Sequence, residues 1–157
     1  TIKLVQDSPN DLYFVFSTQE EVGSRGAQTA AFDLDAELGI AVDVTPVGNL
    51  LGLKMQVHIG AGPAIKVRDV GMIADPRIVK WMTRGAEKAR IPHQLEVLVV
   101  GSTDARVMQI TKAGMPAGAL SIPCRYVHSP SEMIDKDDYA NTIKLLAHLL
   151  NQTVVLE

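Results

Sequence analysis

Residues 38–44 read Leu-Gly-Ile-Ala-Val-Asp-Val, and this stretch decides the fold class of the chain. It is short, apolar and rich in β-branched residues, which predicts a buried strand. Similar runs recur at 12–18, 64–68, 94–100 and 117–122. Because helical segments separate these runs, the sequence predicts an α/β fold. We expect a three-layer sandwich with a mainly parallel or mixed sheet between helices.

The helices are predicted from capping residues and apolar faces. Asp75-Pro76 opens a helix that runs to about Arg90, because Pro76 suits a first turn and apolar residues follow at helical spacing. Ser24 is placed to cap an earlier helix. The other expected elements are the tail of an amphipathic helix at 1–6, a helix at 24–32, a short strand at 55–59, and helices at 104–114 and 137–152.

Composition narrows the functional classes. The 157 residues fit one domain, and 46% hydrophobic with 21% charged content is typical of a soluble globular protein. A net charge of -3 without a basic cluster gives no reason to expect nucleic acid as a partner. No apolar stretch is long enough for a membrane span. The single cysteine, Cys124, cannot form an internal disulfide, which favours a cytoplasmic location.

Two adjacent carboxylates, Glu20 and Glu21, directly follow the predicted strand at 12–18. On an extended backbone, successive side chains point to opposite sides. One glutamate is then free to hold a metal while the other acts as a general base, a division of labour that metal-dependent hydrolases need. The simpler interpretation is a solvated acidic loop.

Other candidate ligands also follow strands. Asp43 lies in an apolar run, where its charge needs a metal, a buried arginine or backbone amides to compensate it. His128 lies in the loop after the strand at 117–122. Together Glu21, Asp43 and His128 form a donor set that suits zinc, cobalt or manganese. Asp104 has two interpretations, a helix cap or an active-site residue, and capping is the simpler one.

Five ordered motifs carry a family resemblance. The chain resembles the dinuclear metallo-aminopeptidases, which include the tetrahedral and glutamyl aminopeptidases, some under the older label cellulase M or endoglucanase. The resemblance covers nearly the whole chain. The matching segments are Gln19-Glu20-Glu21-Val22-Gly23-Ser24-Arg25-Gly26-Ala27, Val42-Asp43-Val44-Thr45, Ile59-Gly60-Ala61-Gly62-Pro63, Ser102-Thr103-Asp104-Ala105 and Arg125-Tyr126-Val127-His128-Ser129-Pro130.

The resemblance implies a role for each site residue. It implies that Glu20 is the general base, that Glu21 and His128 bind one metal ion, and that Asp43 binds the other. It also implies two divalent metal ions, zinc or cobalt, peptide substrates and a homo-oligomer. The family's bridging carboxylate and His-x-Asp pair precede the Gln-Glu-Glu motif, and this chain has neither.

The resemblance thus implies that residues 1–157 are the carboxyl-terminal portion of a zinc-peptidase-like catalytic domain, without its amino-terminal portion and its inserted dimerisation domain. The chain starts with Thr1, which suits a fragment, a processed product or the product of a truncated gene. Three functions compete. The first is a metal-dependent aminopeptidase, and the second is a non-catalytic truncated paralogue that acts as an assembly or regulatory subunit. The third is an endoglucanase, which the single tryptophan and 4% aromatic content disfavour.

Overall fold

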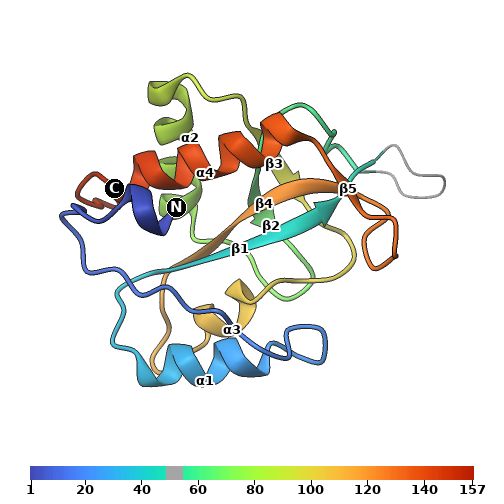
Figure 1. The fold of residues 1–157 in the computed structure, drawn as a ribbon. Coiled ribbons are helices and arrows are strands. Elements are labelled where there is room, and N and C mark those ends of the chain that lie inside the picture. Colours follow the sequence, from blue (N-terminus) through green and yellow to red (C-terminus); the bar gives the residue numbers. More distant parts are fainter. Residues whose placement is uncertain (49–54) are drawn as a thin grey trace.

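The computed structural model describes residues 1–48 and 55–157. Within these ranges one mixed sheet lies between two layers of helix (Figure 1), so the predicted α/β sandwich is confirmed. The strands are β1 (Gly39–Pro46), β2 (Ala64–Arg68), β3 (Gln94–Val97), β4 (Ala117–Arg125) and β5 (Met133–Ile134). The helices are α1 (Arg25–Asp33), α2 (Pro76–Ala89), α3 (Ala105–Gln109) and α4 (Lys136–Leu150), preceded by the 3-10 turn η1 (Ile2–Leu4).

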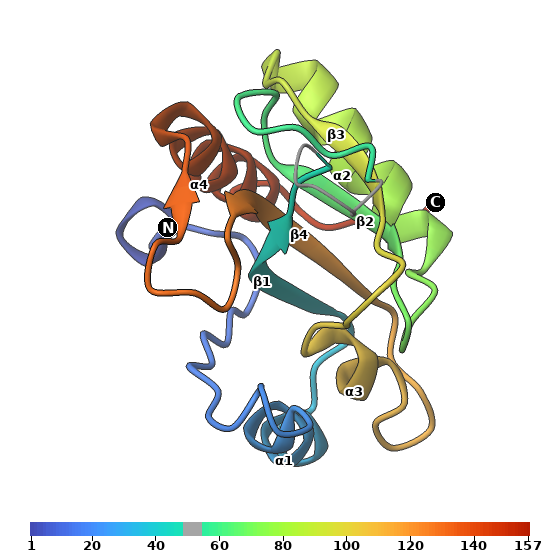
Figure 2. The same cartoon turned by 90° about the vertical axis from the view of Figure 1, so that its right-hand side faces the viewer.

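The strand order is β1-β4-β2-β3, with β5 added beside β4. β1 runs parallel to β4 and β2 parallel to β3, whereas β2 and β4 are antiparallel. Figure 2 shows α2 and α4 on one side of the sheet and α1 with α3 on the other. Because β1 and β4 are parallel, their carboxyl ends lie at the same edge of the sheet. The loop that carries His128 emerges there, whereas Asp43 lies inside β1, before its last residues.

The two faces of the sheet differ in side-chain size. Large apolar residues such as Ile65 and Leu120 face α2 and α4 and form the main core with Ile78, Met82 and Leu145. The opposite face carries small residues, with Ala41, Ala117 and Ala119 in a second cluster beside Ala105 of α3. Small side chains let α3 approach closely, which brings its first turn near the end of β1.

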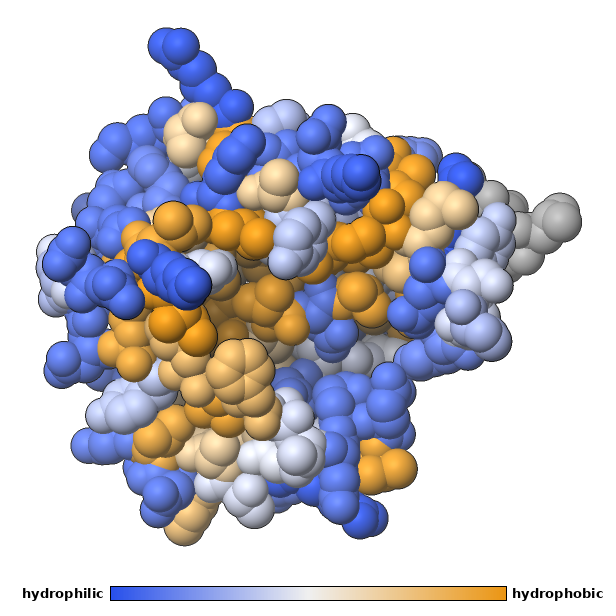
Figure 3. Space-filling model, viewed as in Figure 1, coloured by the Kyte–Doolittle hydropathy of each residue, from blue (hydrophilic) through white to orange (hydrophobic). Residues whose placement is uncertain are grey.

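The predicted strand at 12–18 is wrong. This segment belongs to no strand, and Tyr13 and Phe16 are 61% and 85% exposed. A run of β-forming residues becomes a strand only where a partner supplies hydrogen bonds, and no described strand pairs with it. On the side of the molecule seen in Figure 1, the surface shows apolar residues gathered in a band across its middle (Figure 3).

Other elements are shorter than predicted. The strand expected at 55–59 has no counterpart in the structure, and β3 ends at Val97 rather than at residue 100. The third helix ends at Gln109, and beyond it Lys112 and Gly114 adopt left-handed φ angles of 49° and 99°, which do not fit a helix that continues to residue 114. No helix in the described ranges combines the length and apolarity that crossing a membrane requires.

The buried carboxylate of Asp138 joins α4 to the loop before β2. Its Oδ2 accepts from Gly60 N at 2.6 Å and its Oδ1 from Gly62 N at 2.7 Å. Asp138 is 1% exposed and Gly62 is buried, so the Gly62 amide has no water as a substitute partner, whereas Gly60 is exposed. The carboxylate therefore fixes a glycine-rich loop that local propensity leaves irregular.

We expect Asp138→Ala to lower the free energy of unfolding by about 2–3 kcal/mol, because it leaves the buried Gly62 amide without an acceptor and also removes the bond to the Gly60 amide. The neighbouring Asp137 is exposed and serves as the matched control. Asp137→Ala should cost under about 1 kcal/mol, since only its interaction with the helix dipole is lost. Urea denaturation of both variants checks this, and equal losses would contradict it.

Candidate functional site

Glu20 and Glu21 lie in a tight turn directly before α1. The amides of Gly23 and Ser24 both donate to Glu20 O, at 3.0 and 2.9 Å, and Ser24 has a left-handed φ of 55°. The prediction that the two glutamates alternate on an extended strand is therefore wrong. The turn nevertheless places them in different surroundings, because Glu20 is half-buried and Glu21 is exposed.

The second glycine of the motif, Gly26, lies directly against the backbone of Thr18. Its amide donates to Thr18 O at 2.9 Å, and a Cβ here would lie 2.6 Å from the backbone of Thr18. Glycine thus permits the turn to dock against the segment before it. The prediction that Ser24 caps α1 is wrong, since its side chain makes no capping bond and instead accepts from Arg106 Nε at 3.4 Å.

The structure brings Glu21 and His128 together from positions 107 residues apart. His128 Nε2 lies 3.2 Å from Glu21 Oε1 and 3.1 Å from Oε2. Both His128 and Tyr126 have left-handed φ angles, 64° and 60°, and the His128 amide donates to Glu132 Oε1 at 2.7 Å. Non-glycine residues in this conformation are strained and concentrate at functional sites. The loop is therefore built to present His128 to Glu21.

Asp43 lies near the end of β1, opposite Ser121 of β4. Burial raises the pKa of its carboxyl group, and the nearby charges of Asp104 and Glu21 add to this. The Val44 amide, which donates to Asp43 Oδ1 at 2.7 Å, and the ammonium of Lys66 both lower the pKa again. The Val44 amide and Lys66 therefore compensate only part of the energetic cost of burying the charge of Asp43 in an apolar strand.

Asp104 occupies the N-cap position of α3, but its side chain makes no capping bond. The side-chain cap that the sequence favoured is therefore wrong. Asp104 Oδ2 accepts from Ser17 Oγ at 2.5 Å, while its Oδ1 is buried without a partner among the described residues. Its charge raises the pKa of both Glu20 and Asp43, which places it beside them.

Glu20 has the surroundings of a proton acceptor. Its pKa is raised, first by burial and then by the carboxylates of Asp43, Asp104 and Glu21. Arg106 opposes the shift. A raised pKa makes a carboxylate a stronger base, which suits general base catalysis.

The donor groups fit part of a metal site. Two ligand atoms bound to one tetrahedral zinc at about 2.0–2.1 Å lie about 3.3 Å apart, close to the spacing of Glu21 and His128. Among the residues that the structure describes, no three or more His, Cys, Asp or Glu side chains gather as a complete metal shell. Asp43 is a separate carboxylate, on which the charge of Glu21 acts, and its assignment to a second ion stays a prediction.

Comparison with known proteins decides the family. A model of the M42 glutamyl aminopeptidase family matches residues 1–145. The chain belongs to this family. It is 44% identical over 145 residues to a lysyl aminopeptidase of Pyrococcus furiosus, a match that covers 90% of this chain and 41% of that protein.

Solved structures agree with the M42 assignment. An aminopeptidase from the archaeon Desulfurococcus kamchatkensis superposes with a TM-score of 0.92 at 36% identity, covering 97% of this chain and 44% of that one. A TET1 peptidase of Pyrococcus horikoshii, which assembles into a tetrahedron or a large octahedral shell, gives 0.75 at 31% identity, with 86% and 39% covered. The M42 chain thus spans less than half the length of these relatives.

Sequence reasoning missed a buried ion pair in this M42 chain. Lys66 Nζ of β2 lies 2.8 Å from Glu96 Oε1 of β3, and both side chains are fully buried. Thr45 Oγ1 of β1 donates to the same Glu96 oxygen. The only signal was one charged residue in the middle of each of two apolar strands, and their pairing depends on the register that sets Lys66 opposite Glu96.

Proposed function

We propose that this chain supplies the general base and part of the metal shell of a metal-dependent aminopeptidase, which removes amino-terminal residues from peptides. The observation that carries the proposal is the contact of Glu21 with His128 beside Glu20. The named relatives, which are aminopeptidases, support the same reaction class.

The residues divide into binding and proton transfer. Glu21 and His128 would hold one divalent ion and Asp43 the other, with zinc or cobalt favoured by the carboxylate and imidazole donors. When bound, such ions supply the Lewis acidity that makes water nucleophilic near neutral pH. Glu20 takes the proton of that water and then gives it to the leaving amine.

The proposal also concerns the rest of the catalytic domain, the oligomeric state and the cellular compartment. Residues 1–157 would form the carboxyl-terminal portion of the catalytic domain, and the remaining ligands of the second ion would come from outside these residues. We further propose a homo-oligomer in the cytoplasm. The assemblies of the Pyrococcus horikoshii relative support the oligomer, and the single cysteine supports the reducing compartment.

A blocked-substrate assay tests the function. A family-length enzyme that contains this chain should release the first residue of a peptide with a free amino terminus and leave its acetylated counterpart intact. A chelator should abolish release, and added zinc or cobalt should restore it. If no peptide is cleaved with either metal present, the non-catalytic subunit is the better account. Equal cleavage of the acetylated peptide would contradict an aminopeptidase.

A further inference from the structure

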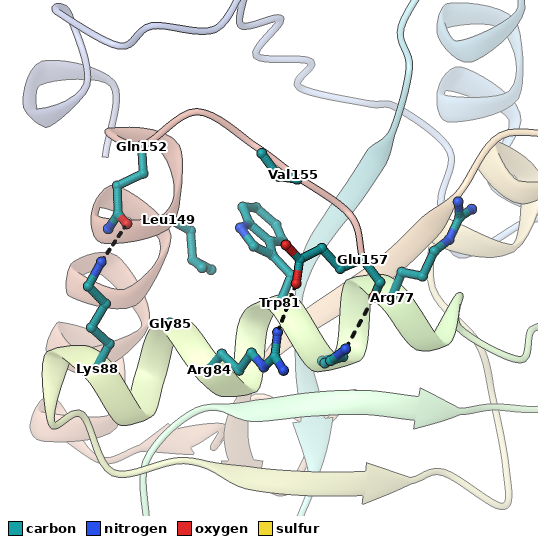
Figure 4. Close-up of a pocket in the computed structure, with 10 residues that line it drawn as sticks. Arg77, Trp81, Arg84, Gly85, Lys88, Leu149, Gln152, Val155 and Glu157 are labelled. Atoms are coloured by element: carbon teal, nitrogen blue, oxygen red, sulfur yellow. Dashed lines mark hydrogen bonds and ion pairs between the residues drawn. The ribbon is translucent and has the colours of Figure 1, made fainter.

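A groove lies on the outer side of the molecule, between α2 and the extended residues 152–157. It has a volume of about 360 Å³, and Figure 4 shows its side chains. Lys80, Arg84 and Lys88 line it from α2, and Leu149 and Val155 line the opposite wall. We call it the α2 groove. None of the residues that line it is assigned to the hydrolytic site.

The α2 groove concentrates positive charge on an acidic protein. Five of the 15 lysines and arginines of the chain fall between residues 77 and 90, although the net charge is -3. Four of them repeat at helical spacing along one side of α2, at positions 77, 80, 84 and 88, although Arg77 is already paired with Asp75 at 2.7 Å. The sequence contains no basic run because the helix, rather than the order of residues, brings these cations together. The stripe is about 16 Å long at 1.5 Å per residue.

Glu157 already places one acidic side chain on this stripe. Arg84 Nη1 lies 3.4 Å from Glu157 Oε2, and Lys80 Nζ donates to the main-chain oxygen of Glu157 at 3.5 Å. Both members of the Arg84–Glu157 pair are mostly exposed, at 59% and 70%. Exposed pairs of this length are weak, so a better ligand can displace the contact.

The groove also has an apolar part suited to a peptide. Trp81 and Leu149 lie between the cations and the tail (Figure 4), and Trp81 packs against the main core. An extended peptide alternates its side chains, so it can direct carboxylates to the stripe and apolar groups to Trp81. A nucleic acid would instead need a wider basic surface.

We propose that the α2 groove is a docking site for an extended, acidic peptide segment of another protein, with Glu157 in the place of one of its carboxylates. A stripe of 16 Å accommodates about five residues of extended chain at 3.3 Å each. The segment therefore carries two or three carboxylates at alternate positions within five residues. The tail competes with it through Glu157.

Trp81 is the only tryptophan of the chain and reports binding directly. The peptide acetyl-Glu-Val-Glu-Val-Glu-amide, titrated into the chain, should change the Trp81 fluorescence saturably. The matched peptide with glutamine in place of glutamate should bind at least tenfold more weakly. Raising the salt concentration should weaken the binding of the acidic peptide, because salt screens the attraction between exposed charges.

Variants assign the contact to the groove. Lys80→Glu combined with Arg84→Glu should weaken binding by about tenfold or more, since two attractive pairs become repulsive. The control is Lys3→Glu combined with Lys136→Glu, which changes the net charge equally at exposed positions outside the groove. Glu157→Gln should tighten binding by about two- to fivefold, because it removes the competing carboxylate.

Three results would overturn the proposal. These are equal binding of the glutamine peptide, equal loss in the two double variants, and tighter binding of an oligonucleotide of the same charge than of the acidic peptide. The last would make the stripe a general polyanion surface. Retention of the circular dichroism spectrum in each variant separates lost binding from lost folding.

Discussion

Glu20→Gln is expected to lower kcat of a family-length enzyme by about two to four orders of magnitude, because the proton acceptor is lost. Glutamine keeps the size and shape of the side chain, so substrate binding should change little and KM should stay close to its original value. Steady-state kinetics with a free-amino peptide check this. Glu37 is exposed and serves as the matched control, and Glu37→Gln should leave kcat unchanged.

The pH profile gives a second readout of the same residue. Glu20 must be ionised to act as the base, and its pKa lies above the ordinary value of 4.5. Activity should therefore fall as the pH drops through this raised pKa. Because Arg106 lowers the pKa of Glu20, Arg106→Gln should move the acidic limb of kcat/KM to higher pH. An unchanged limb would argue against Glu20 as the titrating base.

Lys66→Met is expected to lower the free energy of unfolding by about 3–5 kcal/mol, because it leaves Glu96 charged and unpaired inside the sheet. Glu96 is fully buried, and its second oxygen has no partner among the described residues. Removal of one member of a buried pair costs more than the pair contributes, since desolvation of the remaining charge is uncompensated. Denaturant unfolding measures the change.

The double variant separates this explanation from simple loss of packing. Lys66→Met combined with Glu96→Leu removes both charges and keeps similar volumes, so stability should return to within about 1 kcal/mol of the original chain or exceed it. If the double variant is as unstable as the single one, the pair stabilises the sheet directly. The same unfolding curves then refute the uncompensated charge as the cause.

The central sheet could be predicted from apolar periodicity because its strands have partners within the chain. The runs at 38–44, 64–68 and 117–122 became β1, β2 and β4. The run at 12–18 has the same composition but no partner in the described structure, so composition alone gave the wrong answer. Pairing is a property of the whole sheet, and a local pattern cannot report it.

The candidate site was predictable only in part. His128 follows β4 as expected, but Glu21 meets it from a turn that follows no strand, so the contact came from a different local structure than the one predicted. For Asp104 the sequence left a helix cap and an active-site role open, because its hydrogen bond to Ser17 spans 87 residues and leaves no local pattern. The Lys66–Glu96 ion pair was not predicted for the same reason. Contacts between distant segments follow from register, which the sequence does not display.

The division of labour between Glu20 and Glu21 is the central claim, and metal content tests it most directly. Zinc or cobalt should be counted per chain in family-length Glu20→Gln and Glu21→Gln after equal loading and dialysis. Our account predicts full metal content in Glu20→Gln and reduced content in Glu21→Gln, because only the latter loses a charged ligand. Loss of metal in Glu20→Gln with retention in Glu21→Gln would contradict it and reverse the two roles.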